Sequence, residues 1–144
     1  MSLDWEDRHK NFARTERLAA DADLSSGDLV VLPELFDSGF SLFGREPERF
    51  RGGDSVVTYG WSGLTVCPAI CYDLRFPELF RLGMLAGAEA FAIGANWPRP
   101  RTGHWRALCI ARAIENQAFV FAVNRCGDDP HLGYDGNSMV VGPT

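Results

Sequence analysis

Residues 70–80 read Ile70-Cys71-Tyr72-Asp73-Leu74-Arg75-Phe76-Pro77-Glu78-Leu79-Phe80. An apolar stretch over residues 64–70 leads into the cysteine, and an amphipathic run that contains a proline follows it. Proline is favoured in the first turn of a helix, because its missing N–H costs little there. The pattern therefore predicts a strand, a sharp turn that carries Cys71, and a helix that includes Pro77 in its first turn. A thiol at such a junction is well placed to be a nucleophile, since backbone N–H groups there can stabilise a thiolate and hold an oxyanion.

The rest of the chain alternates between helical and extended patterns. Helices are predicted over residues 5–22, 77–88 and 102–117, the last with Thr102 as its N-cap. Short apolar runs predict strands over residues 29–32, 56–61, 64–70, 90–95, 118–123 and 138–141. The second and third of these strands are expected to form a hairpin around Ser62-Gly63, and residues 45–54 and 128–136 are expected to be loops. Strands that alternate with helices predict an α/β sheet with helices outside it.

Composition narrows the class of protein. The chain has 144 residues, of which 46% are apolar and 23% charged, as is ordinary for one soluble globular domain. The net charge of −5 argues against nucleic acid or an anionic membrane as the main partner. No apolar run approaches the roughly 18 residues of a membrane span, and no basic segment precedes an apolar one as in a signal peptide. We therefore expect a cytoplasmic location.

The cysteines give no sign of a metal site. They stand at positions 67, 71, 109 and 126, without the paired C-x2-C spacing of common zinc sites. A disulfide framework is not expected in a cytosolic chain of this size. Cys67 and Cys109 are expected to be small buried hydrophobes. No metal and no organic cofactor is expected.

Several segments of the chain, in order, are similar to those of the nitrilase or carbon–nitrogen hydrolase superfamily. The Cys71 segment resembles the family's nucleophile segment, and Leu32-Pro33-Glu34-Leu35-Phe36-Asp37-Ser38-Gly39-Phe40 resembles the one that carries its catalytic glutamate. Gly94-Ala95-Asn96-Trp97-Pro98 resembles the pocket segment, and residues 104–116 and 123–125 resemble the helix and strand end beyond it. The resemblance covers residues 28–144. It implies a four-layer α-β-β-α sandwich of the nitrilase type, which is usually built when two such subunits dimerise.

Roles for individual residues follow from this resemblance. Cys71 would be the nucleophile, and the backbone N–H of Tyr72 would hold the oxyanion. Glu34 would be the base; it follows an apolar run and Pro33, where α/β sites gather, and it could take the thiol proton and later activate water. Asn96 and Trp97 resemble pocket-lining residues.

Plainer interpretations of the same residues remain open. Glu34 could be a solvated loop acid, Cys71 a buried inert cysteine, and Asn96 with Trp97 a strand-end turn. Asp73 and Arg75 are expected to brace the turn by a local ion pair. His104 is expected to be structural.

A second glutamate is implied on weaker grounds. Glu46 resembles the family's second glutamate by its spacing from Gly52-Gly53. That residue helps to position the lysine and the substrate. The alternative is a surface charge in a loop of mixed charge.

The family's lysine has no counterpart here. The resemblance implies a Glu–Lys–Cys triad with the lysine between the other two residues in sequence. The chain's single lysine, Lys10, precedes both Glu34 and Cys71. We therefore expect residues 1–144 to be a single carbon–nitrogen hydrolase domain that lacks the first strand, an internal segment near residues 41–44, and the C-terminal part.

The predicted reaction is hydrolysis of a non-peptide carbon–nitrogen bond in a small linear amide. It would proceed through a cysteine thioester and release ammonia, and short ω-amides are the expected substrates. The alternatives are a catalytically inactive binding or assembly module and acyl transfer to an amine. The expected partners are the small-molecule amide and a second copy of the chain in a homodimer or higher homo-oligomer, with no nucleic acid and no membrane.

Overall fold

The fold is built on a mixed five-stranded sheet, in a computed structural model that describes residues 1–39 and 51–144. The strands lie side by side in the order β1-β2-β3-β4-β7. The pairs β2–β3 and β3–β4 are parallel, whereas β1 and β7 run antiparallel to their neighbours. The bounds are β1 Tyr59–Trp61, β2 Leu64–Ile70, β3 Ala90–Ala95, β4 Phe119–Asn124 and β7 Met139–Val141. The α/β class and the hairpin around Ser62-Gly63 are thus confirmed, although β1 is shorter than predicted.

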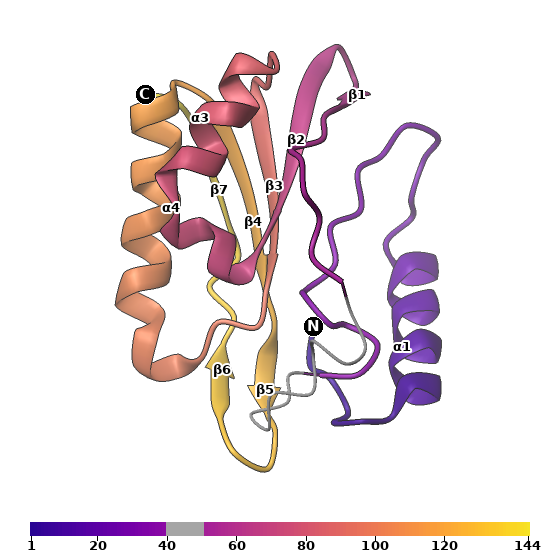
Figure 1. Cartoon of the computed structure of the whole chain (residues 1–144). Helices are drawn as coiled ribbons and strands as arrows, with labels where there is room; N and C mark the ends of the chain where they lie inside the picture. Colours follow the sequence, from indigo (N-terminus) through magenta and orange to yellow (C-terminus); the bar gives the residue numbers. More distant parts are fainter. Residues whose placement is uncertain (40–50) are drawn as a thin grey trace.

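Helices lie on both sides of this sheet (Figure 1). Helices α3 (Pro77–Leu85) and α4 (Thr102–Asn116) cover one face, and α1 (Arg8–Asp21) lies on the opposite side. Two short 3-10 helices, η1 (Cys71–Arg75) and η2 (Arg99–Arg101), lead into α3 and α4. Pro77 begins α3 as predicted, because the first helical residue needs no hydrogen-bonded N–H.

The main core lies between the sheet and the helices α3 and α4. It includes the fully buried side chains of Cys67, Phe80, Phe91, Trp105 and Cys109. The rings of Phe80 and Phe91 pack at a centroid distance of 4.9 Å. Burying a large apolar side chain contributes about 1.5–3 kcal/mol, so this layer is a main source of stability. The prediction that Cys67 and Cys109 are buried hydrophobes is confirmed, and burial raises the pKa of Cys109 to about 12.

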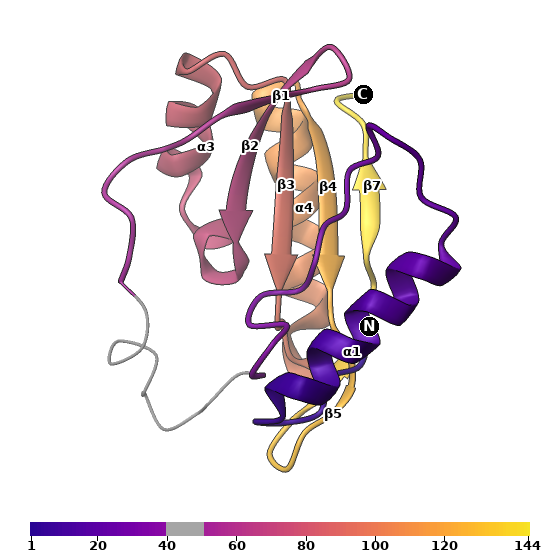
Figure 2. The ribbon, with the colours of Figure 1, turned by 90° about the vertical axis from the view of Figure 1, so that its right-hand side faces the viewer.

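The carboxyl ends of the parallel strands lie at one edge of the sheet. Figure 2 shows the arrowheads of β2, β3 and β4 pointing the same way. Ile70 of β2 pairs with Gly94 of β3, and Ala95 pairs with Asn124 of β4. The residues that follow these strands therefore meet at this edge, which is where sites of α/β sheets gather.

Residues 29–32 were predicted to be a buried strand, and this is wrong. The segment is extended but carries no strand assignment, and Val30 is 50% exposed. A strand needs a neighbouring strand to pair with its N–H and C=O groups. Within residues 1–39 and 51–144 none pairs with this segment, which runs along the face of the sheet beside Gly94 (Figure 2).

Two other local predictions are also wrong. Residues 128–136 are not a plain loop, because β5 (Cys126–Asp128) and β6 (Gly133–Asp135) form an antiparallel hairpin there. Thr102 is not the N-cap of α4; Arg101 takes that position. The preceding η2 already places Thr102 in helical conformation, and its hydroxyl donates to the Arg99 carbonyl at 2.9 Å.

The close approach of residues 32–34 to Gly94 gives a testable prediction. A Cβ at Gly94 would collide with the Leu32 carbonyl oxygen and lie 3.4 Å from the Glu34 nitrogen. We expect Gly94→Ala to lower the free energy of unfolding in urea by about 1–3 kcal/mol, as overpacking does. Gly103→Ala in α4 is the control, since its Cβ meets nothing within 4 Å. Equal unfolding midpoints for the two variants would contradict this account.

Candidate active site

A cavity of about 330 Å³ lies at the carboxyl edge of the parallel strands. It brings together residues that are far apart in sequence, from the turn after residue 33, from η1, and from the segment after β3. Its lining consists of Glu34, Cys71, Tyr72, Arg75, Asn96, Trp97, Pro98, Pro100, Arg101 and Leu132. All the predicted site residues therefore meet in one cavity, except Glu46. That residue lies outside the described part of the chain, so its role stays a prediction.

Cys71 stands at a sharp turn directly after β2. Its φ of 39° is positive, which is a strained conformation for a residue with a side chain. The carboxylate of Asp73 closes this turn by accepting a hydrogen bond of 2.9 Å from the Ile70 N–H. Asp73 thus bonds to the backbone, and no ion pair joins it to Arg75 among the described residues, contrary to our expectation.

Glu34 is held against the sheet edge by Asn96. The Asn96 N–H donates to the Glu34 carboxylate at 3.1 Å. The side-chain amide of Asn96 donates a second, short hydrogen bond to the Glu34 carbonyl. Asn96 is only 4% exposed, so both hydrogen bonds are shielded from water. Asn96 therefore fixes the backbone and the carboxylate of Glu34 together.

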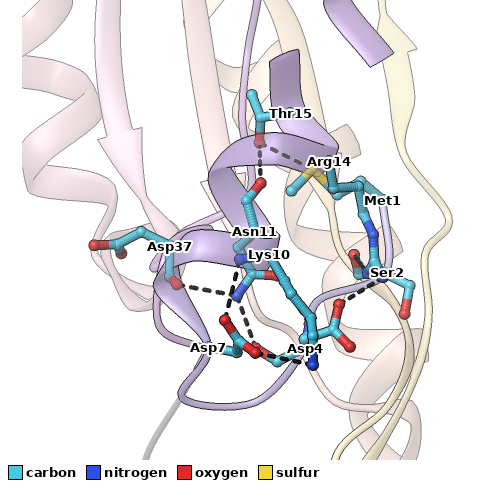
Figure 3. Close-up of polar contacts among 9 residues, drawn as sticks. All are labelled: Met1, Ser2, Asp4, Asp7, Lys10, Asn11, Arg14, Thr15 and Asp37. Atoms are coloured by element: carbon cyan, nitrogen blue, oxygen red, sulfur yellow. Dashed lines mark hydrogen bonds and ion pairs between the residues drawn. The ribbon is translucent and has the colours of Figure 1, made fainter. Parts of the chain in front are cut away.

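A second anchor holds the same segment from the side of α1 (Figure 3). The buried side chain of Asn11 donates to the carbonyls of Asp4 and Asp37 at 2.7 and 3.0 Å. Its oxygen accepts from the Asp4 N–H at 2.8 Å. The turn that begins at Glu34 is therefore attached at both ends.

The surroundings of Cys71 keep its thiol protonated. Burial raises the pKa of Cys71 well above its usual range, and the neighbouring Glu34 carboxylate raises it further. A hydrogen bond from the Asn96 backbone acts in the opposite direction but is outweighed. Glu34 therefore lies beside a thiol, and a carboxylate in this place can accept the proton as the sulfur attacks.

Arg75 supplies positive charge to this cavity and was missed as a site residue. Its guanidinium lies over the rings of Trp97 and Tyr72, at 4.9 and 5.3 Å from their centroids. Its Nε is buried and has no hydrogen-bond partner among the described residues. Trp97 is itself fixed, because its N–H groups donate to Asn124 and to the Arg101 carbonyl. The sequence signal for Arg75 was its place four positions after Cys71, on the predicted turn.

The chain's lysine lies elsewhere. Lys10 is exposed on α1, and its ammonium pairs with the Asp7 carboxylate at 3.0 Å (Figure 3). Hydrogen bonding to Asp7 raises the pKa of Lys10. Lys10 does not line the cavity, and neither does the exposed His104 of α4.

The described residues form neither a metal-binding cluster nor a membrane-crossing helix. No three or more His, Cys, Asp or Glu side chains gather there as a metal site would require. No helix among residues 1–39 and 51–144 is long and apolar enough to cross a membrane.

Comparison with known proteins places the chain in a family. The model of the carbon-nitrogen hydrolase family matches residues 42–144. A 2-oxoglutaramate amidase of Bacillus subtilis is 50% identical over 74 residues, which are 51% of this chain and 29% of that protein. The omega-amidase YafV of Escherichia coli is 44% identical over 96 residues, which are 66% of this chain and 37% of that protein. The chain thus spans well under half the length of these relatives.

Solved structures agree with this placement. XC1258 from Xanthomonas campestris, a CN-hydrolase superfamily protein with an arsenic adduct in its active site, superposes with a TM-score of 0.86 at 27% identity. The match covers 98% of this chain and 79% of that one. An amidase from Nesterenkonia, with the acetamide moiety of fluoroacetamide on its active-site cysteine, matches 65% of this chain and 36% of its own at 32% identity and a TM-score of 0.61. The chain has an α/β sandwich fold and belongs to the carbon–nitrogen hydrolase family.

Proposed function

We propose that the Cys71 cavity is the site of an amidase that hydrolyses the carbon–nitrogen bond of a small linear amide. The observation that carries this proposal is the meeting of Glu34 and Cys71 in one cavity at the carboxyl edge of the sheet. Membership of the carbon–nitrogen hydrolase family supports it.

The proposed reaction would proceed by the following steps at the residues that line the cavity. Cys71 Sγ attacks the amide carbon while its proton passes to Glu34, and the Tyr72 N–H stabilises the oxyanion. The tetrahedral intermediate collapses as Glu34 returns the proton to the leaving nitrogen, which departs as ammonia and leaves a thioester on Cys71. Glu34 then takes a proton from water, which attacks the thioester. The carboxylic acid is released, and Cys71 regains its proton.

We further propose that the acyl part of the substrate carries a carboxylate. The guanidinium of Arg75 lines the cavity and has a buried Nε without a partner among the described residues. A planar guanidinium pairs with a carboxylate through paired N–H groups. Arg101 adds a second positive charge to the lining. The names of the relatives, 2-oxoglutaramate amidase and omega-amidase, agree with a short ω-amide of this kind.

The missing lysine bears on the expected rate. We propose that the intact protein carries a further block near residues 41–44, with a lysine that would place a cation beside Cys71. The residues around this position, Glu46 among them, lie outside the described part of the chain. Loss of one such stabilising group costs on the order of 100- to 1000-fold in rate. The chain of 144 residues is therefore expected to be a weak catalyst.

One observation favours a second candidate, a non-catalytic binding or assembly module. The pKa of Cys71 is raised by burial and by Glu34, and no lysine of the described residues lies in the cavity to offset this. Acyl transfer to an amine would use the same residues.

We also propose that the protein forms a homodimer in which two subunits build a four-layer assembly, and that its location is cytoplasmic. Leu82 of α3 and Ile114 of α4 are exposed apolar side chains that such a dimer would bury.

Ammonia release tests the proposed reaction. We expect slow release from 2-oxoglutaramate, less from butyramide, which has no carboxylate for Arg75, and none from the matching nitrile. A coupled glutamate dehydrogenase assay measures it, with Cys71→Ala as the blank. Release that persists in Cys71→Ala would contradict the site, and no release above that blank would favour the binding module.

Removing the charge of Glu34 tests how it acts on Cys71. The Glu34 carboxylate destabilises the thiolate, so Glu34→Gln should lower the pKa of Cys71 and raise its thiolate fraction at neutral pH. Each unit of pKa changes that fraction about tenfold while the thiol remains mostly protonated. We expect faster alkylation by iodoacetamide, followed by peptide mass spectrometry across pH, together with loss of amide hydrolysis.

The control for this variant is Glu78→Gln. Glu78 is an exposed acid on α3 that does not line the cavity. The Glu78→Gln variant removes the same charge from the surface, and it should leave the rates of Cys71 alkylation and of amide hydrolysis unchanged. Alkylation of Glu34→Gln that is no faster than that of the parent protein would count against the electrostatic coupling.

A further inference from the structure

The β5–β6 hairpin places one apolar side chain, Leu132, in the Cys71 cavity. Leu132 lies at the hairpin tip, between Asp128 of β5 and Gly133 of β6. It is half-buried. It joins Trp97, Pro98 and Pro100 as the apolar part of a lining whose other members are mostly polar or charged. The cavity therefore has an apolar wall as well as a reactive end.

The tip of this hairpin is held in one shape by Asp129. Its carboxylate accepts hydrogen bonds from the N–H groups of His131 and Leu132, at 2.9 and 2.8 Å. Its own N–H donates to the Leu132 carbonyl at 2.9 Å. Leu132 thus forms hydrogen bonds through both its backbone N–H and its C=O. These hydrogen bonds fix the direction in which its side chain projects from the hairpin tip.

The tip is in turn attached to the core by a buried ion pair. The Arg125 guanidinium lies 3.4 Å from the second carboxylate oxygen of Asp129, and the two side chains are 0% and 2% exposed. Arg125 also stacks over the buried Tyr134 of β6, at 4.1 Å from the ring centroid. Breaking a buried pair of this kind is strongly unfavourable, because it leaves an uncompensated charge. The hairpin tip therefore cannot swing away from the cavity at low cost.

A second set of ion pairs joins the hairpin to the η2 segment, which also contributes to the lining. Arg99 of η2 pairs with Asp135 of β6 at 2.5 Å and with Asp128 of β5 at 3.5 Å. Pro98, Pro100 and Arg101, which flank Arg99 in the chain, all line the cavity. The ion pairs of Arg99 therefore hold the hairpin and the η2 segment together.

We propose that Leu132 is a specificity-determining residue, whose side chain limits the length of the acyl group that can lie between Cys71 and the apolar wall. This inference rests on the proposed function in one respect, that the cavity receives the acyl part of the molecule that meets Cys71. A fixed apolar side chain discriminates by steric exclusion, and one methylene is worth about 10- to 200-fold.

Alkylation of Cys71 by two reagents tests the inference without requiring turnover. The probes are iodoacetamide and N-hexyl iodoacetamide, and the readout is the ratio of their rates at Cys71 by peptide mass spectrometry. A change in the pKa of Cys71 affects both rates alike and cancels in the ratio. We expect Leu132→Ala to raise the ratio of hexyl to parent reagent about tenfold and Leu132→Trp to lower it by a similar factor.

Leu85→Ala is the matched control, because Leu85 is an 85% exposed leucine on α3 outside the cavity. It should leave the ratio unchanged. A ratio that stays within about twofold in both Leu132 variants, or moves the same way in both, overturns the inference. So does a Cys71 that neither reagent modifies. A shifted ratio without ammonia release would reject the amidase and support the proposed role of Leu132. Ammonia release with an unshifted ratio would support the amidase and reject that role.

Discussion

The pair of hydrogen bonds from Asn96 to Glu34 is the contact on which the site depends. Glu34 sits on a segment that has no strand partner among the described residues, so no ladder of backbone hydrogen bonds fixes its position. Asn96 follows β3 directly and is rigid because that strand pairs on both sides. By binding both the carboxylate and the carbonyl of Glu34, Asn96 attaches this part of the segment to the sheet.

The electrostatics of the cavity follow from this attachment. Asn96 places a carboxylate beside a buried thiol, and both effects disfavour the thiolate. Among the described residues that line the cavity, the positive charges belong to Arg75 and Arg101, and the Arg75 guanidinium lies over aromatic rings. The site thus brings together a thiol, a carboxylate and cations, which are the groups that the proposed amidase would use. It has no lysine among its described residues to stabilise the thiolate itself.

The sequence was sufficient for the parts of the fold that local rules control. The apolar run before Cys71 and Pro77 after it located β2 and α3, and residues 90–95 were predicted as the strand β3 with its observed bounds. The prediction failed for residues 29–32, because an apolar run does not reveal whether a neighbouring strand is present. It also failed at the β5–β6 hairpin, whose strands are three residues each and lack alternating apolar residues.

The residues of the candidate site were likewise predicted only in part. Cys71, Tyr72, Asn96 and Trp97 were predicted through the resemblance to the family, and their place at strand ends or in the turns after them agrees with where sites of α/β sheets gather. Leu132 could not be found in this way. Its place depends on the buried pair of Arg125 and Asp129, which is a tertiary contact without a local sequence signal. Arg75 was predicted to form a local ion pair with Asp73. Charge spacing alone does not show that the guanidinium packs on the rings of Tyr72 and Trp97.

Protection of Cys71 by a bound amide is the most direct measurement of the central claim that this cavity binds small amides at the thiol. Acrylamide would be added with and without 2-oxoglutaramate, and the adducts on Cys71 and on the exposed Cys126 would be quantified by peptide mass spectrometry. The account predicts that the amide slows modification of Cys71 in a saturable manner and leaves that of Cys126 unchanged. Equal modification of Cys71 with and without the amide would contradict it.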